Sequence, residues 1–135
     1  MGQKVGLDTS ILIYFLEKHP DCFRQVRRIM DELEARQITG VFSIIGLIEI
    51  LTGAKKSHEY DMAADYKRLI TNYPNVTISG ISESIVDIAS DLRARYKIST
   101  PDAIHLATAI DFGAEKFITN DVNLKKIKEI IVEVL

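Results

Sequence analysis

Four acidic residues stand at points where a folded chain could bring their side chains together: Asp8, Glu49, Asp102 and Asp121. Asp8 and Asp121 each follow a short β-type run where a helix begins, and Asp102 lies in the first turn of a helix that Pro101 begins. In a parallel α/β sheet, sites form outside the carboxyl ends of the strands, where loops lead into helices. Each aspartate by itself is also a common helix cap, so both interpretations remain open for a single position.

Glu49 is the only charged residue in 41–51, a stretch whose apolar residues predict a largely buried helix. Gly46 and Gly53 lie three residues before and four residues after Glu49, along the same helical stripe. Each glycine weakens a helix by roughly 1 kcal/mol relative to alanine, so the pair indicates space kept open beside the carboxylate. The alternative is that Glu49 faces solvent on a narrow polar edge.

Carboxylates that converge in one cleft repel and raise one another's pKa, and a hard divalent cation removes that cost. Oxygen ligands suit Mg²⁺ or Mn²⁺, and no Cys/His spacing in the sequence suggests zinc. Such ions can lower the pKa of a bound water and neutralise charge that develops on a phosphodiester. The four acids therefore favour metal-dependent phosphodiester hydrolysis.

Alternating strands and helices, without hairpin turn signals, predict helices packed on a mostly parallel sheet, an α/β fold. Short β-type runs supply the strands, and caps, prolines and helical periodicity supply the helices. The predicted strands are 4–7, 38–42, 75–79, 116–119 and 130–135. The predicted helices are 11–16 after a polar start at 8–10, 20–33, 43–53, 57–73, 82–97, 101–113 and a short one at 121–128.

The length of 135 residues predicts a single domain, 1–135, and the composition of 47% apolar and 27% charged residues is that of a globular protein. Neither a signal peptide nor a membrane span is expected. The lone cysteine, Cys22, fits a reducing cytoplasm and is expected on the buried side of a helix rather than as a catalytic thiol. Because the net charge is −2, a nucleic-acid substrate would need a local basic patch or bound cations.

Four segments resemble, in order and in spacing, the signature blocks of the PIN-domain ribonucleases, and the arrangement is similar to that of VapC-type toxins over essentially the whole chain. The segments are VGLDTSIL at 5–12, LIEILTG at 47–53, TPDAIHLATA at 100–109 and FITND at 117–121. One block would be weak evidence, whereas four in order form a specific signal.

The resemblance implies a three-layer α/β/α sandwich and endonucleolytic cleavage of RNA with Mg²⁺ or Mn²⁺. Asp8, Glu49, Asp102 and Asp121 match the acidic quartet of the family, which binds the metal and carries catalysis. Thr119 and Asn120 match the polar residues before the last acid, where they would orient it or a bound water. The chain departs from the family at Gly46, where a hydroxyl residue is common. A homodimer and a small antitoxin, whose arginine or other polar groups plug the acidic cleft, are also implied.

Basic residues flank two of the acid-bearing segments and are the best candidates for contacts to RNA phosphates. The alternative is that they are solvated cations, which collect at helix C-termini. They are Lys55 and Lys56 after the helix of Glu49, and Arg93, Arg95 and Lys97 before Asp102. Lys125, Lys126 and Lys128 are expected to be ordinary surface residues.

His105 lies three residues after Asp102 on the same helix and invites assignment as a general base. The family often has histidine at this position without using it as the base. We expect a packed, hydrogen-bonded histidine, so that His105→Ala lowers stability more than cleavage.

Two other functions remain open. The first is a stand-alone PIN nuclease of RNA processing or decay, without an antitoxin. The second is a PIN-like scaffold that binds RNA or protein and has lost catalysis. All four acids are retained, which argues against the scaffold because clustered negative charge lowers the stability of a fold.

Overall fold

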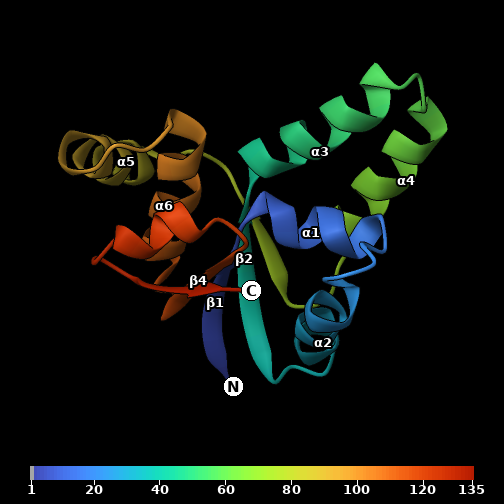
Figure 1. Cartoon of the computed structure of the whole chain (residues 1–135), viewed down its shortest axis with the longest axis horizontal. Coiled ribbons are helices and arrows are strands. Elements are labelled where there is room, and N and C mark those ends of the chain that lie inside the picture. Colours follow the sequence, from blue (N-terminus) through green and yellow to red (C-terminus); the bar gives the residue numbers. More distant parts are fainter. Residues whose placement is uncertain (1) are drawn as a thin grey trace.

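Five parallel strands form the central sheet of this computed structural model, which describes residues 2–135. Their order across the sheet is β3-β2-β1-β4-β5, and each neighbouring pair runs parallel. The strands are β1 (Gln3–Leu7), β2 (Ile38–Ser43), β3 (Val76–Ser79), β4 (Lys116–Thr119) and β5 (Ile131–Val134) (Figure 1). In the sheet, β2 and β3 lie on one side of β1, whereas β4 and β5 lie on the other side. The strand order therefore changes direction between β1 and β4, and α/β folds place their sites at such a point.

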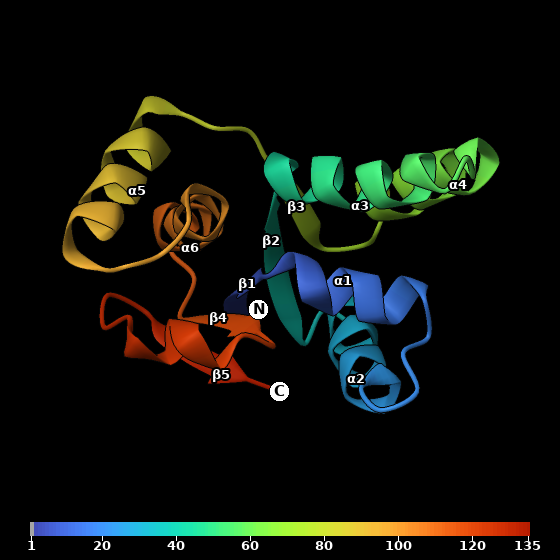
Figure 2. The ribbon, with the colours of Figure 1, turned by 45° about the horizontal axis from the view of Figure 1, so that its top comes forward.

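Helices cover both faces of the sheet, which confirms the predicted three-layer α/β/α arrangement (Figure 2). α5 and α6 lie on one side, and α1 and α2 lie on the other. The helices are α1 (Thr9–Leu16), α2 (Phe23–Glu34), α3 (Ile44–Lys56), α4 (Tyr60–Thr71), α5 (Glu83–Arg95) and α6 (Thr100–Phe112), with a 3-10 helix η1 (Val122–Lys126).

Along each strand, successive side chains point to opposite faces of the sheet, so they contribute to two apolar clusters, one on each face. Val5 and Leu7 of β1 pack in the cluster with α1 and α2, whereas Phe117 of β4 packs in the cluster with α5 and α6. Gly6 faces α6, and a Cβ there would lie only 2.3 Å from the Cβ of Ala109. The glycine thus allows the last turns of α6 to approach the central strand closely.

Several predicted helix boundaries were wrong. α2 begins at Phe23 rather than at residue 20, because the backbone amides of Asp21 and Cys22 donate to Nδ1 of His19 and form a turn before the helix. Cys22 is therefore partly exposed just before α2, which corrects its expected place on the buried side of a helix.

The region after Glu49 also differs from the prediction. α3 continues through Gly53 to Lys56, and α4 begins at Tyr60 rather than at residue 57. The segment predicted as a helix at 121–128 is the shorter 3-10 helix η1.

Within residues 2–135, no helix combines the length and the apolar character needed to cross a membrane.

Candidate active site

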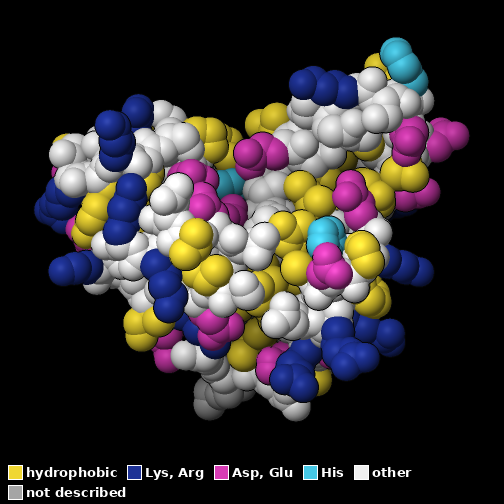
Figure 3. All heavy atoms as spheres, in the orientation of Figure 1, with side chains coloured by type: hydrophobic (Ala, Val, Ile, Leu, Met, Phe, Trp, Pro, Cys, Tyr) yellow, Lys and Arg dark blue, Asp and Glu magenta, His cyan; other side chains and the backbone are white. Residues whose placement is uncertain are grey.

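The four sequence-predicted acids lie around one notch at the carboxyl end of the sheet. Asp8 directly follows β1, and Asp121 comes two residues after β4, the strand paired with β1. Asp102 lies in the first turn of α6, which packs on β1. Glu49 approaches from α3, and acidic side chains gather in the hollow between α3 and the α5–α6 side (Figure 3).

The carboxylate of Asp8 is held by two donors. It caps α1, so that Oδ1 accepts a hydrogen bond from the backbone amide of Thr9 at 2.8 Å. Oδ2 accepts a hydrogen bond from the hydroxyl of Thr119 at 2.6 Å. The same Thr119 oxygen accepts from the backbone amide of Asp121 at 3.0 Å. Thr119 is fully buried and therefore fixes Asp8 and the backbone of Asp121 relative to each other.

Asp102 and Asp121 complete the aspartate side of the notch. Asp121 is exposed and caps η1 by accepting from the backbone amide of Asn123 at 2.9 Å. Burial raises the pKa of Asp102, and the charges of Asp8 and Asp121 raise it further, while a hydrogen bond with Ser99 opposes the shift. The three aspartates thus repel one another, which is the situation that a bound cation relieves.

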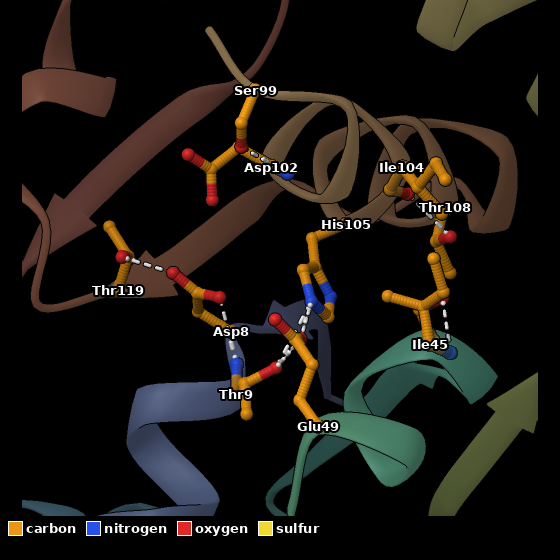
Figure 4. A network of polar contacts seen from close by, with 11 residues as sticks. Asp8, Thr9, Ile45, Glu49, Ser99, Asp102, Ile104, His105, Thr108 and Thr119 are labelled. Atoms are coloured by element: carbon orange, nitrogen blue, oxygen red, sulfur yellow. Dashed lines mark hydrogen bonds and ion pairs between the residues drawn. The ribbon is translucent and has the colours of Figure 1, made fainter. Parts of the chain in front are cut away.

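Glu49 faces the same notch from the opposite side, rather than the far surface of the molecule (Figure 4). Its Oε1 accepts from the hydroxyl of Thr9 at 2.8 Å and lies 2.9 Å from Nε2 of His105. Nε2 also lies 3.0 Å from the hydroxyl oxygen of Thr9. His105 is only 3% exposed, as expected for a packed, hydrogen-bonded residue, and its partner is a carboxylate of the predicted quartet.

The two glycines beside Glu49 play different parts. A Cβ at Gly46 would lie 2.2 Å from the ring of Phe42 and 2.8 Å from the hydroxyl of Thr9. A Cβ at Gly53 would meet nothing within 4 Å. Gly46 therefore makes room for the ring of Phe42 and for the Thr9 hydroxyl that donates to Glu49, rather than for the carboxylate itself, and the prediction that Gly53 keeps space open was wrong.

The ligand set suits a hard cation, because carboxylate oxygens are the donors that Mg²⁺ and Mn²⁺ prefer. In this conformation, however, no three His, Cys, Asp or Glu side chains among residues 2–135 converge closely enough to hold a metal ion. Metal binding therefore requires the acids to draw closer than they stand here.

The predicted supporting residues divide into two kinds. Thr119 contacts the acids, as described above. Asn120 instead donates to the hydroxyl of Tyr14 on α1 at 2.7 Å, so it ties the loop after β4 to α1. Neither Thr9 nor Tyr14 was singled out as a functional residue from sequence.

The candidate RNA contacts near α6 make bonds within the protein. Arg93 donates to the carbonyl of Ile98 and to the hydroxyl of Thr100, which ties the end of α5 to the start of α6. Arg95 pairs with Glu129 at 2.7 Å. Lys97 has an exposed side chain, and its carbonyl oxygen accepts from Nζ of Lys126 at 3.0 Å.

Lys55 and Lys56 are exposed in the last turn of α3, and neither forms an ion pair with any residue in 2–135. Their position at a helix C-terminus is favourable for cations in its own right.

The PIN domain family model matches residues 5–130. No curated protein matches the chain significantly. The chain is similar to VapBC2 of Rickettsia felis bound to a promoter DNA fragment, with 23% identity, 98% coverage of both chains and a TM-score of 0.77. It is similar to a toxin–antitoxin complex of Klebsiella pneumoniae, with 29% identity, 96% coverage of both chains and a TM-score of 0.70.

A third similar structure is VapC20 of Mycobacterium tuberculosis, a toxin that cleaves the sarcin–ricin loop. Its identity is 14%, its TM-score is 0.71, and the match covers 93% of this chain and 98% of that chain. The three structures share the fold of this chain over nearly its whole length.

Proposed function

The chain belongs to the PIN domain family, and from this membership and the geometry of the notch we propose that it is a metal-dependent endoribonuclease. Its site consists of Asp8, Glu49, Asp102 and Asp121. The observation that supports the proposal is that Thr119 ties Asp8 to the backbone of Asp121 beside Asp102, whose pKa is raised by burial and further by the charges of Asp8 and Asp121. Three negative charges placed close together destabilise a fold unless a bound cation or a proton neutralises part of the charge.

In this proposal the four carboxylates hold Mg²⁺ or Mn²⁺ between the end of the sheet and α3. When bound, such an ion activates water and neutralises the charge that develops on the phosphate and on the leaving oxygen. Thr119 and the backbone amide of Thr9 orient Asp8. Glu49 faces the aspartates from α3, so a phosphodiester strand can lie in the notch between them.

Cleavage of single-stranded RNA by the wild type and by Asp8→Asn tests the proposal. We expect the wild type to cleave with Mg²⁺ or Mn²⁺ and to stop when a chelator is added. Because Asp8 is a direct ligand, its loss is expected to cost more than the roughly 100-fold that loss of an outer-shell partner causes.

Asp61→Asn is the matched control, because Asp61 also lies in the first turn of a helix, α4, but outside the notch. It is expected to leave cleavage unchanged. Cleavage that persists in Asp8→Asn, or that resists the chelator, would contradict the proposed site.

We further propose that the enzyme is the toxin of a toxin–antitoxin pair. The similar structures from Rickettsia felis and Klebsiella pneumoniae are toxin–antitoxin complexes. In this chain, a hollow of about 170 Å³ between α1, α3 and α4 includes Glu49 and is also lined by Glu17 and Glu59, with no lysine or arginine among its lining residues. Such a hollow suits a basic side chain of an antitoxin.

Expression of the chain alone distinguishes a toxin from a stand-alone PIN nuclease of RNA processing. We expect the wild type to arrest growth, and Asp8→Asn, produced at the same level, to leave growth normal. Normal growth with active wild-type enzyme would favour the stand-alone nuclease.

A homodimer acting in the cytoplasm is also proposed. Apolar side chains are exposed on α3, on the loop after β3 and on α5: Ile48 at 59%, Ile81 at 45% and Val86 at 54%. Exposed apolar side chains favour association where they adjoin in one surface patch. Sedimentation velocity is expected to give a dimer for the wild type and a monomer for Ile48→Glu, and a monomeric wild type would contradict it.

A further inference from the structure

His105 is buried, and its two ring nitrogens have different surroundings. Nε2 lies 2.9 Å from Oε1 of Glu49 and 3.0 Å from the hydroxyl oxygen of Thr9. Nδ1 is buried and has no hydrogen-bond partner among residues 2–135. The ring packs at 6.1 Å from that of Phe42, with an angle of 24° between the planes.

The position of the ring proton follows from these contacts. The hydroxyl of Thr9 donates its only hydrogen to Glu49, so both oxygens that face Nε2 present lone pairs. A proton on Nε2 serves both oxygens. A proton on Nδ1 would leave a buried donor without an acceptor and would set the lone pair of Nε2 against a carboxylate. The contacts therefore favour a proton on Nε2.

The two donors meet on one oxygen of Glu49. Thr9 and His105 both reach Oε1, whereas no donor among residues 2–135 contacts Oε2. Three elements supply this arrangement, namely α1, α3 and α6, and Gly46 leaves the space for the Thr9 hydroxyl. One carboxylate oxygen is thus fixed and the other is free to face the notch.

We propose that His105, which donates a hydrogen bond from Nε2, is a positioning residue that acts with Thr9 to hold Oε1 of Glu49 and to present Oε2 to the metal site. This role rests on the proposed function. It differs from a general base, because the nitrogen that faces the notch already carries a proton and the other nitrogen is enclosed. Outer-shell donors of this kind set the geometry of a ligand and hence the affinity for metal.

The first test measures the tautomer in the full-length chain without metal. Nitrogen chemical shifts and long-range proton couplings of ¹⁵N-labelled histidine distinguish Nε2–H from Nδ1–H at neutral pH, and the resonance is assigned by its loss in His105→Gln. We expect Nε2 to carry the proton. A proton on Nδ1 with none on Nε2 would overturn the proposal.

The second test uses two amides that imitate different ring nitrogens. The amide nitrogen of His105→Gln reaches the position of Nε2, whereas that of His105→Asn corresponds to Nδ1. We expect His105→Asn to lose about 10- to 100-fold in Mn²⁺ affinity by calorimetry, and His105→Gln to retain most of the affinity. Equal affinities in the two variants would overturn the proposal. Melting curves verify that each variant is folded.

Thr9 gives a second pair if the His105 variants do not fold. Thr9→Ser keeps the donor to Oε1 and is expected to bind Mn²⁺ as the wild type does, whereas Thr9→Val removes the donor and is expected to bind more weakly. Equal binding would overturn the proposal. A wild type that binds no Mn²⁺ would instead contradict the proposed function, while the tautomer, measured without metal, would still decide the hydrogen-bond arrangement.

Discussion

On one side of the notch, three aspartates lie at the starts of helices, with Thr119 also holding Asp8, and on the other side a glutamate takes its position from side chains of other helices. Asp8 and Asp121 cap α1 and η1, and Asp102 lies in the capped first turn of α6. We call these three residues the aspartate wall. Glu49 on α3, which we call the glutamate wall, is held through Thr9 and His105.

The difference shows that one side of a site can be assembled by local helix starts and the other side by contacts between distant parts of the chain. The aspartate wall is built from helix caps, which form with the helices themselves. Glu49 is 44% exposed and depends on contacts that exist only once α1, α3 and α6 have packed together.

Removing the hydroxyl of Thr119 should weaken the aspartate wall most. Thr119→Val leaves Oδ2 of buried Asp8 without its donor. Hydrogen bonds to charged groups contribute about 1.5–3 kcal/mol, so we expect the free energy of unfolding to fall by that amount in urea titrations. Mn²⁺ affinity is expected to fall about 10- to 100-fold. Thr119→Ser keeps the hydroxyl and should bind Mn²⁺ normally, and equal weakening in both variants would show that packing alone matters.

A methyl group at Gly46 should disturb the glutamate wall. Gly46→Ala places a Cβ 2.2 Å from the ring of Phe42 and 2.8 Å from the hydroxyl of Thr9, so one of them must shift. Overpacking of this kind costs about 1–3 kcal/mol. Thermal denaturation should therefore show a lower melting temperature, together with weaker Mn²⁺ binding.

Gly53→Ala, on the same helix, is the control. Its Cβ meets nothing within 4 Å, and alanine is favoured over glycine in a helix by up to about 1 kcal/mol. We expect Gly53→Ala to stabilise the protein. If the two alanine variants changed stability in the same direction, the close contacts around Gly46 would not be what sets the geometry of this wall.

The aspartate wall could be predicted from sequence because its signals are local. A β-type run followed by Asp8, and a proline followed by Asp102, each identify a carboxylate at a helix start within a few residues. The alternation of strands and helices then predicts that such starts meet at one edge of a parallel sheet. The same local signals led to wrong boundaries where a side chain such as His19 formed a turn.

The glutamate wall could be predicted only in part. The charge of Glu49 among apolar residues indicated a site, but its partners lie 40 residues from it in Thr9 and 56 residues from it in His105. No local pattern couples residues at such separations. The pairing of Arg95 with Glu129, 34 residues apart, was missed for the same reason.

Removing one charge from the aspartate wall should raise the stability of the metal-free protein. Because the pKa of Asp102 is raised in the fold, its charged form costs stability, and that cost is fully present once the pH exceeds the raised value. Asp102→Asn is therefore expected to melt at a higher temperature than the wild type at neutral pH. The advantage should vanish below pH 3.8, the ordinary pKa of the group, where both forms are neutral. A lower melting temperature at neutral pH would contradict the repulsion.

The smallest effect concerns the cations beside each wall. Lys55 and Lys56, beyond Glu49, have no ionic partner in residues 2–135, whereas Arg95, before Asp102, is paired with Glu129. A free cation can release counterions from RNA, with a slope of log affinity on log salt of about 0.7 for each phosphate contact on a single strand.

Asp8→Asn serves as the background, so that RNA stays intact during the titration. We expect the Lys55→Ala, Lys56→Ala double variant to flatten the slope by at most about 1.4, and Arg95→Ala to leave it unchanged. An unaltered slope in the double variant would mean that these lysines contact no phosphate. A flattened slope in Arg95→Ala would indicate instead that the RNA binds on the aspartate side of the notch.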